Sequence, residues 1–264
     1  MAEKQRYFIE LAYDGTNYHG WQVQPNAITV QELLNKALSI ILRESVETTG
    51  CGRTDTGVHA TQFFAHFDVE SMVNRQWSMD DLVKNIDHSP FTIDSRGLNA
   101  ILPKDIAIKR IIPVHPTAHA RFDATLRSYD YHIHFAKDPF RLNRSWELRD
   151  KPDIALMNEA AGIMMEHTDF SCFSKSNTQT FTNNCKINRA EWLESEKGMV
   201  FHISADRFLR NMVRAIVGTL LPIGFKEMEP EGIRAIIDSR NRSNAGTSVP
   251  ACGLYLTEVR YPYL

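Results

Sequence analysis

The chain has 264 residues, of which 43% are hydrophobic and 23% charged, a balance that excludes global disorder. Its formal net charge of −2 excludes a strongly basic protein that coats nucleic acid without discrimination. No apolar run approaches the length of about 20 residues that a membrane-spanning helix needs, and the N-terminal residues lack the apolar core of a signal peptide.

Composition alone favours an enzyme acting on a small molecule, because RNA would have to bind through local arginine clusters on a balanced surface. The cysteines do not form C-x-x-C pairs, so we expect reduced thiols and a cytoplasmic protein. They are Cys51, Cys172, Cys185 and Cys252.

The first part of the chain mixes strand and helix patterns. Alternating apolar residues predict strands over 6–13, 46–51, 60–69 and 106–112. Helical periodicity predicts helices over 29–43 and 80–86. The string TVQE at 29–32 is a capping box that opens the first helix. We expect 88–98 to be irregular and Pro113 and Pro116 to break the chain.

The second part repeats this mixture. We expect strands over 127–135, 187–195, 199–205 and 253–261. We expect helices over 153–166, 210–223 and 230–239. The prolines near residue 115 suggest an N-terminal domain over 1–115 and a C-terminal domain over 116–264. The sequence therefore predicts an α+β protein of two α/β sandwich halves, with mainly antiparallel sheets covered by helices on one face.

The most unusual segment is the glycine-punctuated string GCGRTDTGVH at 50–59. Its glycines allow the backbone to approach a ligand closely. Arg53 and Asp55 are two residues apart, so in an extended loop they could form a charge pair. The residues alone slightly favour another interpretation, a tight turn in which Asp55 accepts hydrogen bonds from local backbone N–H groups.

A second segment, 118–131, combines basic and aromatic residues. Arg121 and Arg127 could neutralise phosphates, and Tyr129 or Tyr131 could stack on an unpaired base. The alternative is that the two tyrosines, which share one face of a strand, simply pack in the core.

A third segment, 206–218, places Arg207, Arg210 and Arg214 at helical spacings of three and four. They could line a solvated helix face. However, Arg214 directly precedes an apolar stretch, and a buried arginine needs a carboxylate partner. Asp55 is a candidate for that partner.

Other chemistries have weaker support. His115 and His119 are four apart and His132 and His134 two apart, but no cysteine or carboxylate pattern completes a metal site. The sequence has no P-loop, no G-x-G-x-x-G string and no G-x-S-x-G elbow.

Taken in order, the motifs resemble the tRNA pseudouridine synthase A family over essentially the whole chain. The G-R-T-D-x-G-V-H string is the most specific of them. The matching strings are YDG at 13–15, YHGWQ at 18–22, VQE at 30–32, GRTDTGVH at 52–59, LP at 102–103 with DI at 105–106, HARF at 119–122, MVRAIVG at 212–218 and GLYL at 253–256.

The resemblance implies specific roles. Asp55 falls on the catalytic aspartate, Tyr129 rather than Tyr131 on the tyrosine that contacts the target base, and Arg214 on the arginine that pairs with the aspartate. Arg53 falls on an arginine that helps to extrude the base. The family implies two ferredoxin-like halves around a central cleft, a homodimer, tRNA as the substrate at positions 38, 39 and 40, and neither a metal nor an organic cofactor.

The sequence departs from the family pattern between residues 82 and 102, where we expect an insertion centred on 88–95.

Three alternatives remain open: an RNA-binding module without catalysis, a metal-dependent hydrolase built on the histidines, and a related synthase acting on another RNA.

Overall fold

The computed structural model describes residues 4–70, 93–175 and 181–264. The strands in these ranges are β1 (Lys4–Tyr13), β2 (Thr49–Gly50), β3 (His59–Glu70), β4 (Ile106–Val114), β5 (Leu126–His134), β6 (Trp146–Glu147), β7 (Ile187–Ser195), β8 (Gly198–Ala205) and β9 (Leu254–Arg260). The α-helices are α1 (Val30–Leu42), α3 (Ser95–Ile101), α4 (Ile154–Met164), α5 (Met212–Gly224) and α6 (Gly232–Asp238). Within the described ranges, no helix has the length and apolar character needed to cross a membrane.

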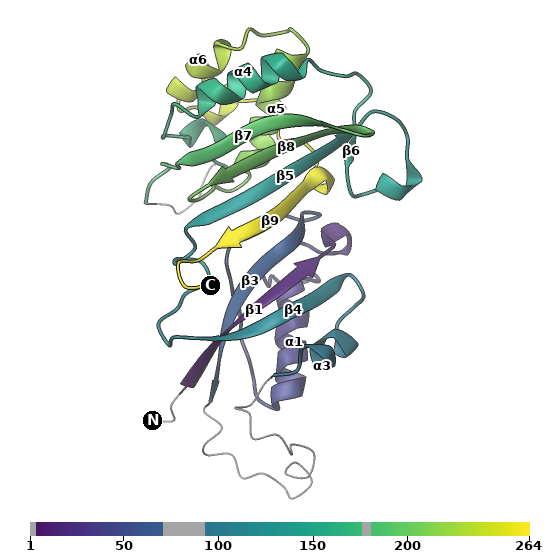
Figure 1. Cartoon of the computed structure of the whole chain (residues 1–264), viewed down its shortest axis with the longest axis vertical. Helices are drawn as coiled ribbons and strands as arrows, with labels where there is room; N and C mark the ends of the chain where they lie inside the picture. The colour runs from purple at the N-terminus through teal and green to yellow at the C-terminus, as the bar shows by residue number, and fades with distance from the viewer. Residues whose placement is uncertain (1–3, 71–92, 176–180) are drawn as a thin grey trace, which may run out of the picture.

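The strands form one sheet in the order β4-β1-β3-β9-β5-β8-β7, with β2 beside β3 and β6 beside β5 (Figure 1). The β3–β9 and β5–β6 pairs are parallel and the other pairs are antiparallel. The expected α+β class with a mainly antiparallel sheet is confirmed.

The C-terminal strand β9 joins the two parts of this sheet. It lies between β3 and β5 in Figure 1, and its pairing with β3 is short, with His59 opposite Tyr255 and Ala60 opposite Leu256. The rings of His59 and Tyr255 stack with centroids 4.5 Å apart. Strands from both parts of the chain therefore share one sheet, while the expected division into two ferredoxin-like halves stays a prediction.

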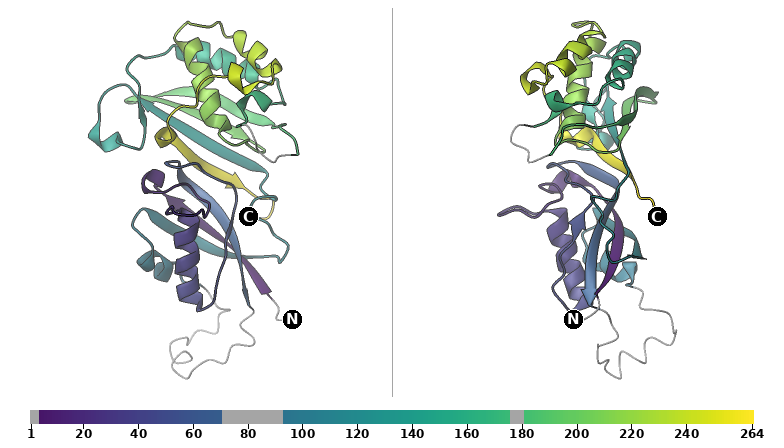
Figure 2. Two further views of the ribbon diagram at one scale, coloured as in Figure 1. Left: turned by 180° about the vertical axis from the view of Figure 1, so that it is seen from behind. Right: turned by 90° about the vertical axis from the view of Figure 1, so that its left-hand side faces the viewer.

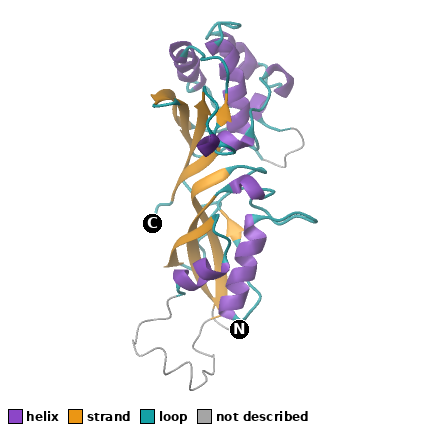
Figure 3. Ribbon diagram, turned by 90° about the vertical axis from the view of Figure 1, so that its right-hand side faces the viewer, coloured by secondary structure: helices purple, strands orange, loops and turns teal. Residues whose placement is uncertain are grey.

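The buried side chains of the described residues form two hydrophobic clusters. One packs β1 and β3 against α1, and the other packs β5, β7 and β8 against α4 and α5. Figure 2 shows the two groups of helices at opposite ends of the molecule, and Figure 3 shows the helices mainly on one side of the strands. Tyr129 contacts both clusters, so β5 lies where the two cores meet.

The first helix begins as its sequence predicts. The Thr29 side chain accepts a hydrogen bond from the Glu32 backbone N–H at 3.3 Å, which satisfies one of the free donors at the start of α1. Its buried side chains are Val30, Leu34, Ala37, Leu38 and Leu42.

Three expectations about the elements were wrong, each for a local reason. Residues 95–101 form α3, because the Asp94 side chain caps the Arg96 N–H and starts a helix in a stretch expected to be irregular. Strand β4 continues through Pro113, which an edge strand tolerates because one side of its backbone needs no partner. Helix α5 starts at Met212, because Asn211 has a left-handed backbone with φ of 67°. The helix expected over 80–86 lies outside the described residues.

A histidine on β3 connects this strand to the segment that follows β4. His66 is 7% exposed, and its Nδ1 atom accepts a hydrogen bond from the Ala120 N–H at 3.1 Å. Burial is the main reason why its pKa falls to about 4. The positive charges of Arg6 and His119 lower it further, and the carboxylates of Asp68 and Asp123 oppose the shift.

We expect the folded state to lose stability in mild acid through His66. Because its folded pKa of about 4 lies below the unfolded value of 6.5, the contribution is complete above pH 6.5 and is lost as the pH falls towards 4. The loss amounts to about 2–3 kcal/mol. Urea unfolding at several pH values measures it. The variant His66→Gln does not titrate, so it should lose less stability over this range; equal losses in both proteins would contradict the assignment.

Candidate active site

The loop between β2 and β3 presents Asp55. The Cys51 N–H anchors the start of the loop by donating to the Phe64 carbonyl at 2.7 Å. The Val58 N–H donates to the Asp55 carbonyl at 3.2 Å and closes a turn. Gly57 completes this turn with a φ of 79°, which favours glycine.

The segment after β1 packs closely against the backbone of the same loop. A Cβ atom on Gly15 would lie 2.0 Å from the Val58 carbonyl oxygen, and one on Gly20 would lie 2.2 Å from the Thr54 carbonyl oxygen. The Trp21 N–H donates to that Thr54 oxygen at 3.4 Å. The two glycines therefore allow a close backbone contact between residues 13–22 and the Asp55 loop that any side chain would block.

Asp55 pairs with arginines that follow β8. Arg214, in the first turn of α5, places Nη1 3.1 Å from Asp55 Oδ2, and the two residues are 159 positions apart in the sequence. Arg214 Nε donates to the Val249 carbonyl at 2.7 Å, which fixes the direction of the guanidinium. Arg210 is more distant, with Nε 4.0 Å from Asp55 Oδ1. The Asp55 side chain remains 30% exposed, so a substrate can reach it.

Neither interpretation that residue spacing offered holds for the Asp55 side chain, although the tight turn itself is present in the backbone. Arg53 is exposed and forms no ion pair within residues 4–70, 93–175 and 181–264. In the same ranges, the Asp55 carboxylate accepts no hydrogen bond from a local backbone N–H. The nearby charge comes instead from a distant segment, which the spacing of Arg53 and Asp55 cannot reveal.

Tyr129 and Tyr131 share a strand face but occupy different environments. Tyr131 is fully buried, and its hydroxyl donates to the Pro250 carbonyl at 2.7 Å, so it is a core residue. Tyr129 packs edge-on against Phe208 with centroids 5.1 Å apart. Its hydroxyl has no hydrogen-bond partner in the described part of the chain, which leaves it available to a ligand.

Burial raises the pKa of Tyr129. The charges of Cys51 and Asp55 act in the same direction, whereas Arg127 lowers the pKa. The phenol is therefore protonated at neutral pH, and it can donate a hydrogen bond or present its ring for stacking.

Arg127 has a role that its sequence context did not reveal. Its sequence context allowed phosphate binding as one interpretation, but it is 9% exposed and its guanidinium donates to three backbone carbonyls. The acceptors are Cys51 at 2.8 Å, Arg121 at 2.7 Å and Asp206 at 3.1 Å. Alternation along β5 places Arg127 on the same face as Tyr129, and this was the available signal for an inward-facing side chain. Arg127 thus holds three segments together beside the loop that carries Asp55.

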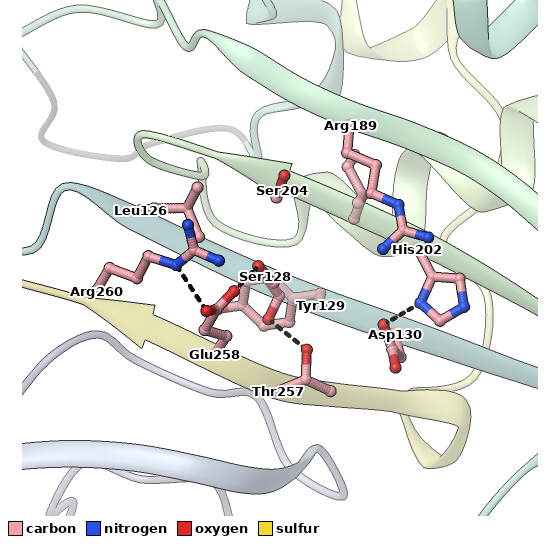
Figure 4. Close-up of a pocket in the computed structure, with 11 residues that line it drawn as sticks. Leu126, Ser128, Tyr129, Asp130, Arg189, His202, Ser204, Thr257, Glu258 and Arg260 are labelled. Carbon is pink, nitrogen blue, oxygen red and sulfur yellow. Dashed lines mark hydrogen bonds and ion pairs between the residues drawn. The ribbon is translucent and has the colours of Figure 1, made fainter.

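A separate hollow of about 370 Å³ lies on the sheet face away from the helices (Figure 4). Its polar groups mostly pair with each other: Asp130 with His202 at 2.6 Å, and Glu258 with Ser128 at 3.1 Å and with Arg260 at 2.6 Å. Tyr129 is among its lining residues, but neither Asp55 nor Arg214 lines it, so the hollow is not the space beside the Asp55 carboxylate.

The histidines considered for a metal site are dispersed. His134 is buried and its Nδ1 contacts the Ser145 hydroxyl at 3.0 Å, whereas His115 contacts Thr117. Among the described residues, no three or more histidine, cysteine, aspartate or glutamate side chains gather as metal ligands would. The four cysteines are free thiols.

Comparison with known proteins identifies the family. The tRNA pseudouridine synthase family model matches residues 166–262. The tRNA pseudouridine synthase A of Bacteroides fragilis is 48% identical, covering 98% of this chain and 97% of that protein. The corresponding protein of Francisella tularensis is 35% identical, covering 98% and 95%. The chain belongs to the tRNA pseudouridine synthase A family.

A tRNA pseudouridine synthase is an isomerase, so the alternatives of a metal-dependent hydrolase and of an RNA-binding module without catalysis are set aside. A second close relative, from Bacteroides thetaiotaomicron, is 49% identical over 98% of this chain and 91% of that protein. Among solved structures, an unknown protein from Galdieria sulphuraria aligns with 85% of this chain at 11% identity and a TM-score of 0.20, too low to bear on the fold.

Proposed function

We propose that this tRNA pseudouridine synthase isomerises uridines in the anticodon arm, at tRNA positions 38, 39 and 40, and that Asp55 is its catalytic carboxylate. The observation that carries the assignment of Asp55 is its ion pair with Arg214, at 3.1 Å. An arginine beside a carboxylate favours the ionised form and orients its oxygens. The partial exposure of both side chains leaves room for a substrate.

The reaction needs only proton transfers and a reactive carboxylate. The glycosidic bond between N1 of uracil and C1′ of ribose breaks, and a bond between C5 of uracil and the same C1′ forms. C5 loses a proton and N1 gains one, so the atoms balance without an oxidant, a reductant or a nucleotide. An ionised Asp55 can serve either of two routes, attack on the base ring or assistance at the ribose.

The target uridine must leave the stack of the anticodon arm to reach Asp55. We propose that Arg53, exposed on the same loop, helps to extrude it. Tyr129 would then contact the extruded base, stacking on it and directing its free hydroxyl to it. The partly buried position of Tyr129 and its lack of a hydrogen-bond partner within the described residues support this role.

Incubation of the protein with unmodified tRNA transcripts, followed by chemical mapping of pseudouridine, tests this function. We expect pseudouridine at positions 38, 39 and 40 wherever the transcript has uridine there. Transcripts with cytidine at these three positions are the control and should stay unmodified. Pseudouridine at other positions, or none in any transcript, would refute the proposal.

Tyr129→Phe is expected to lower kcat by about 10²-fold, the usual contribution of a positioned proton-transfer group. It should leave tRNA affinity close to that of the wild type, because the ring that stacks on the base is retained. Single-turnover kinetics and filter binding on one transcript measure the two effects. A variant with full activity would confine Tyr129 to stacking.

We also propose the architecture that the family implies. Two ferredoxin-like halves, 1–115 and 116–264, would enclose a central cleft, and two chains would form a homodimer. The two hydrophobic clusters support the division, although Ala118, Ala120 and residues of β9 belong to the first cluster. The family resemblance supports the dimer, and light scattering should give twice the chain mass of 30.2 kDa.

A further inference from the structure

A turn near the candidate active site exposes an aromatic ring. Phe122 is 75% exposed, and the Arg121 guanidinium carbon lies 5.7 Å from the centroid of its ring. The ring also rests against His119, with centroids 4.3 Å apart. A single exposed apolar side chain needs no explanation by itself. The residues around Phe122 indicate a binding role that its exposure alone would not.

The backbone of this turn is fixed by its hydrogen bonds. The six consecutive N–H groups from Ala118 to Asp123 all donate hydrogen bonds, and two of them, from Arg121 and Phe122, reach the His119 Nδ1 atom at 3.1 and 3.3 Å. Turns of this kind on a surface usually leave several such groups to water. The backbone position of Phe122 is therefore set by the fold.

The carbonyl groups of the turn are held by side chains from two distant parts of the chain and from the strand that follows the turn. Arg6 Nη1 donates to Ala118 at 2.9 Å, the Tyr261 hydroxyl donates to Ala120 at 2.6 Å, and Arg127 Nη2 donates to Arg121 at 2.7 Å. These contacts tie the turn to β1, to the chain end and to β5.

The same turn lies among positive charges. Arg127 holds together the three segments that carry Arg53, Arg121 and Arg207, which we call the arginine cluster. Burial lowers the pKa of Arg121, and the charges of Arg53, Arg127 and Arg207 lower it further, so these guanidiniums repel one another. In the described part of the chain, no member of the cluster forms an ion pair. The arginine cluster therefore lacks a negative partner within the described residues. A phosphate group can supply that charge, because its oxygens match the geometry of guanidinium groups.

We propose that Phe122 and the arginine cluster bind a nucleotide that flanks the target uridine, with its base stacked on the Phe122 ring and its phosphates against the guanidiniums. Extrusion of a uridine leaves its neighbours without a stacking partner, and an aromatic ring accepts any base. The site rests on the proposed function for its position beside Asp55, since Arg53 belongs to both the catalytic loop and the cluster.

Binding of an unmodified tRNA transcript, measured by filter binding, tests this site without requiring catalysis. Phe122→Ala should raise Kd roughly 5- to 100-fold, the range for loss of one base–aromatic stack. Phe122→Tyr keeps the ring and should bind near the wild-type level. The control Ile40→Ala removes an apolar side chain that is 53% exposed on α1 and should leave Kd unchanged. Wild-type binding by Phe122→Ala, or equal weakening by Phe122→Tyr, would overturn the proposal.

Two further measurements separate the parts of the site. Arg121→Gln should reduce the slope of log Kd against log salt concentration by about one unit, as loss of one phosphate contact does. The second measurement is pseudouridine formation by the wild-type protein, compared with its tRNA binding. A wild-type protein that forms no pseudouridine but binds tRNA in a Phe122-dependent way would refute the proposed function and leave this site standing. An unchanged salt slope in Arg121→Gln would overturn the phosphate contact.

Discussion

Replacing Asp55 with asparagine is expected to abolish pseudouridine formation, lowering kcat/KM on tRNA by about 10⁴-fold or more, as removal of a central catalytic side chain does in other enzymes. Asparagine keeps the size and shape of aspartate but cannot act as an ionised carboxylate. Because the side chain lies on a loop and is 30% exposed, the fold should be retained. Chemical mapping of pseudouridine after long incubation measures the loss.

The matched control for this change is Asp150→Asn, which removes the same charge from an exposed position in the loop before α4. It should have wild-type activity. Filter binding should show that Asp55→Asn still binds tRNA, since the arginine cluster and Phe122 remain. Normal turnover by Asp55→Asn would remove Asp55 from the catalytic role.

Replacing Arg214 with methionine should lower kcat by roughly 10²- to 10³-fold, comparable to the loss of a charge-stabilising donor in other active sites. The change leaves Asp55 without its closest positive charge and the Val249 carbonyl without its donor. We also expect a decrease of about 1–3 kcal/mol in the free energy of unfolding, because the hydrogen bonds involve a charged group. Single-turnover kinetics and urea unfolding measure the two effects.

Arg210→Met provides the comparison. It removes the same charge just before α5, but Arg210 is 57% exposed and its Nε lies 4.0 Å from Asp55. A long, exposed contact is worth little, so the decrease in kcat should be much smaller than for Arg214→Met. Equal effects of the two variants would mean that general positive charge, and not the short contact with Arg214, supports Asp55.

Much of the fold could be predicted because local signals decide it. The capping threonine of α1, the alternation along β5 and the hairpin of β7 and β8 each lie within a few residues of the structure they form. The failures have physical causes outside the local pattern. Pro113 is tolerated only because β4 lies at an edge, and edge position depends on the order of strands in the sheet. The single sheet depends on β9, whose neighbours are distant in sequence.

Less of the candidate site than of the fold could be predicted from the residues alone. Spacing suggested partners for Asp55 within its own loop, whereas the nearest partner is Arg214, 159 positions away. Only the resemblance to a family joined the two. The structural role of Arg127 could not be predicted because its environment, three carbonyls from three segments, exists only after folding. The turn that carries Phe122 is likewise held by side chains of β1, of β3 and of Tyr261, which are distant from it in sequence.

The short pairing of β3 with β9 has a consequence for how the enzyme acquires activity. The His59 imidazole contacts the Cys252 carbonyl across 193 positions of sequence, so closing this joint requires the closure of a very long loop. Contacts of such long range form slowly, after those within each cluster. Trp21 and Trp192 lie in different clusters and become buried as each core consolidates. During refolding, fluorescence should therefore recover before turnover, because burial of Trp21 and Trp192 does not by itself complete the pairing of β3 with β9.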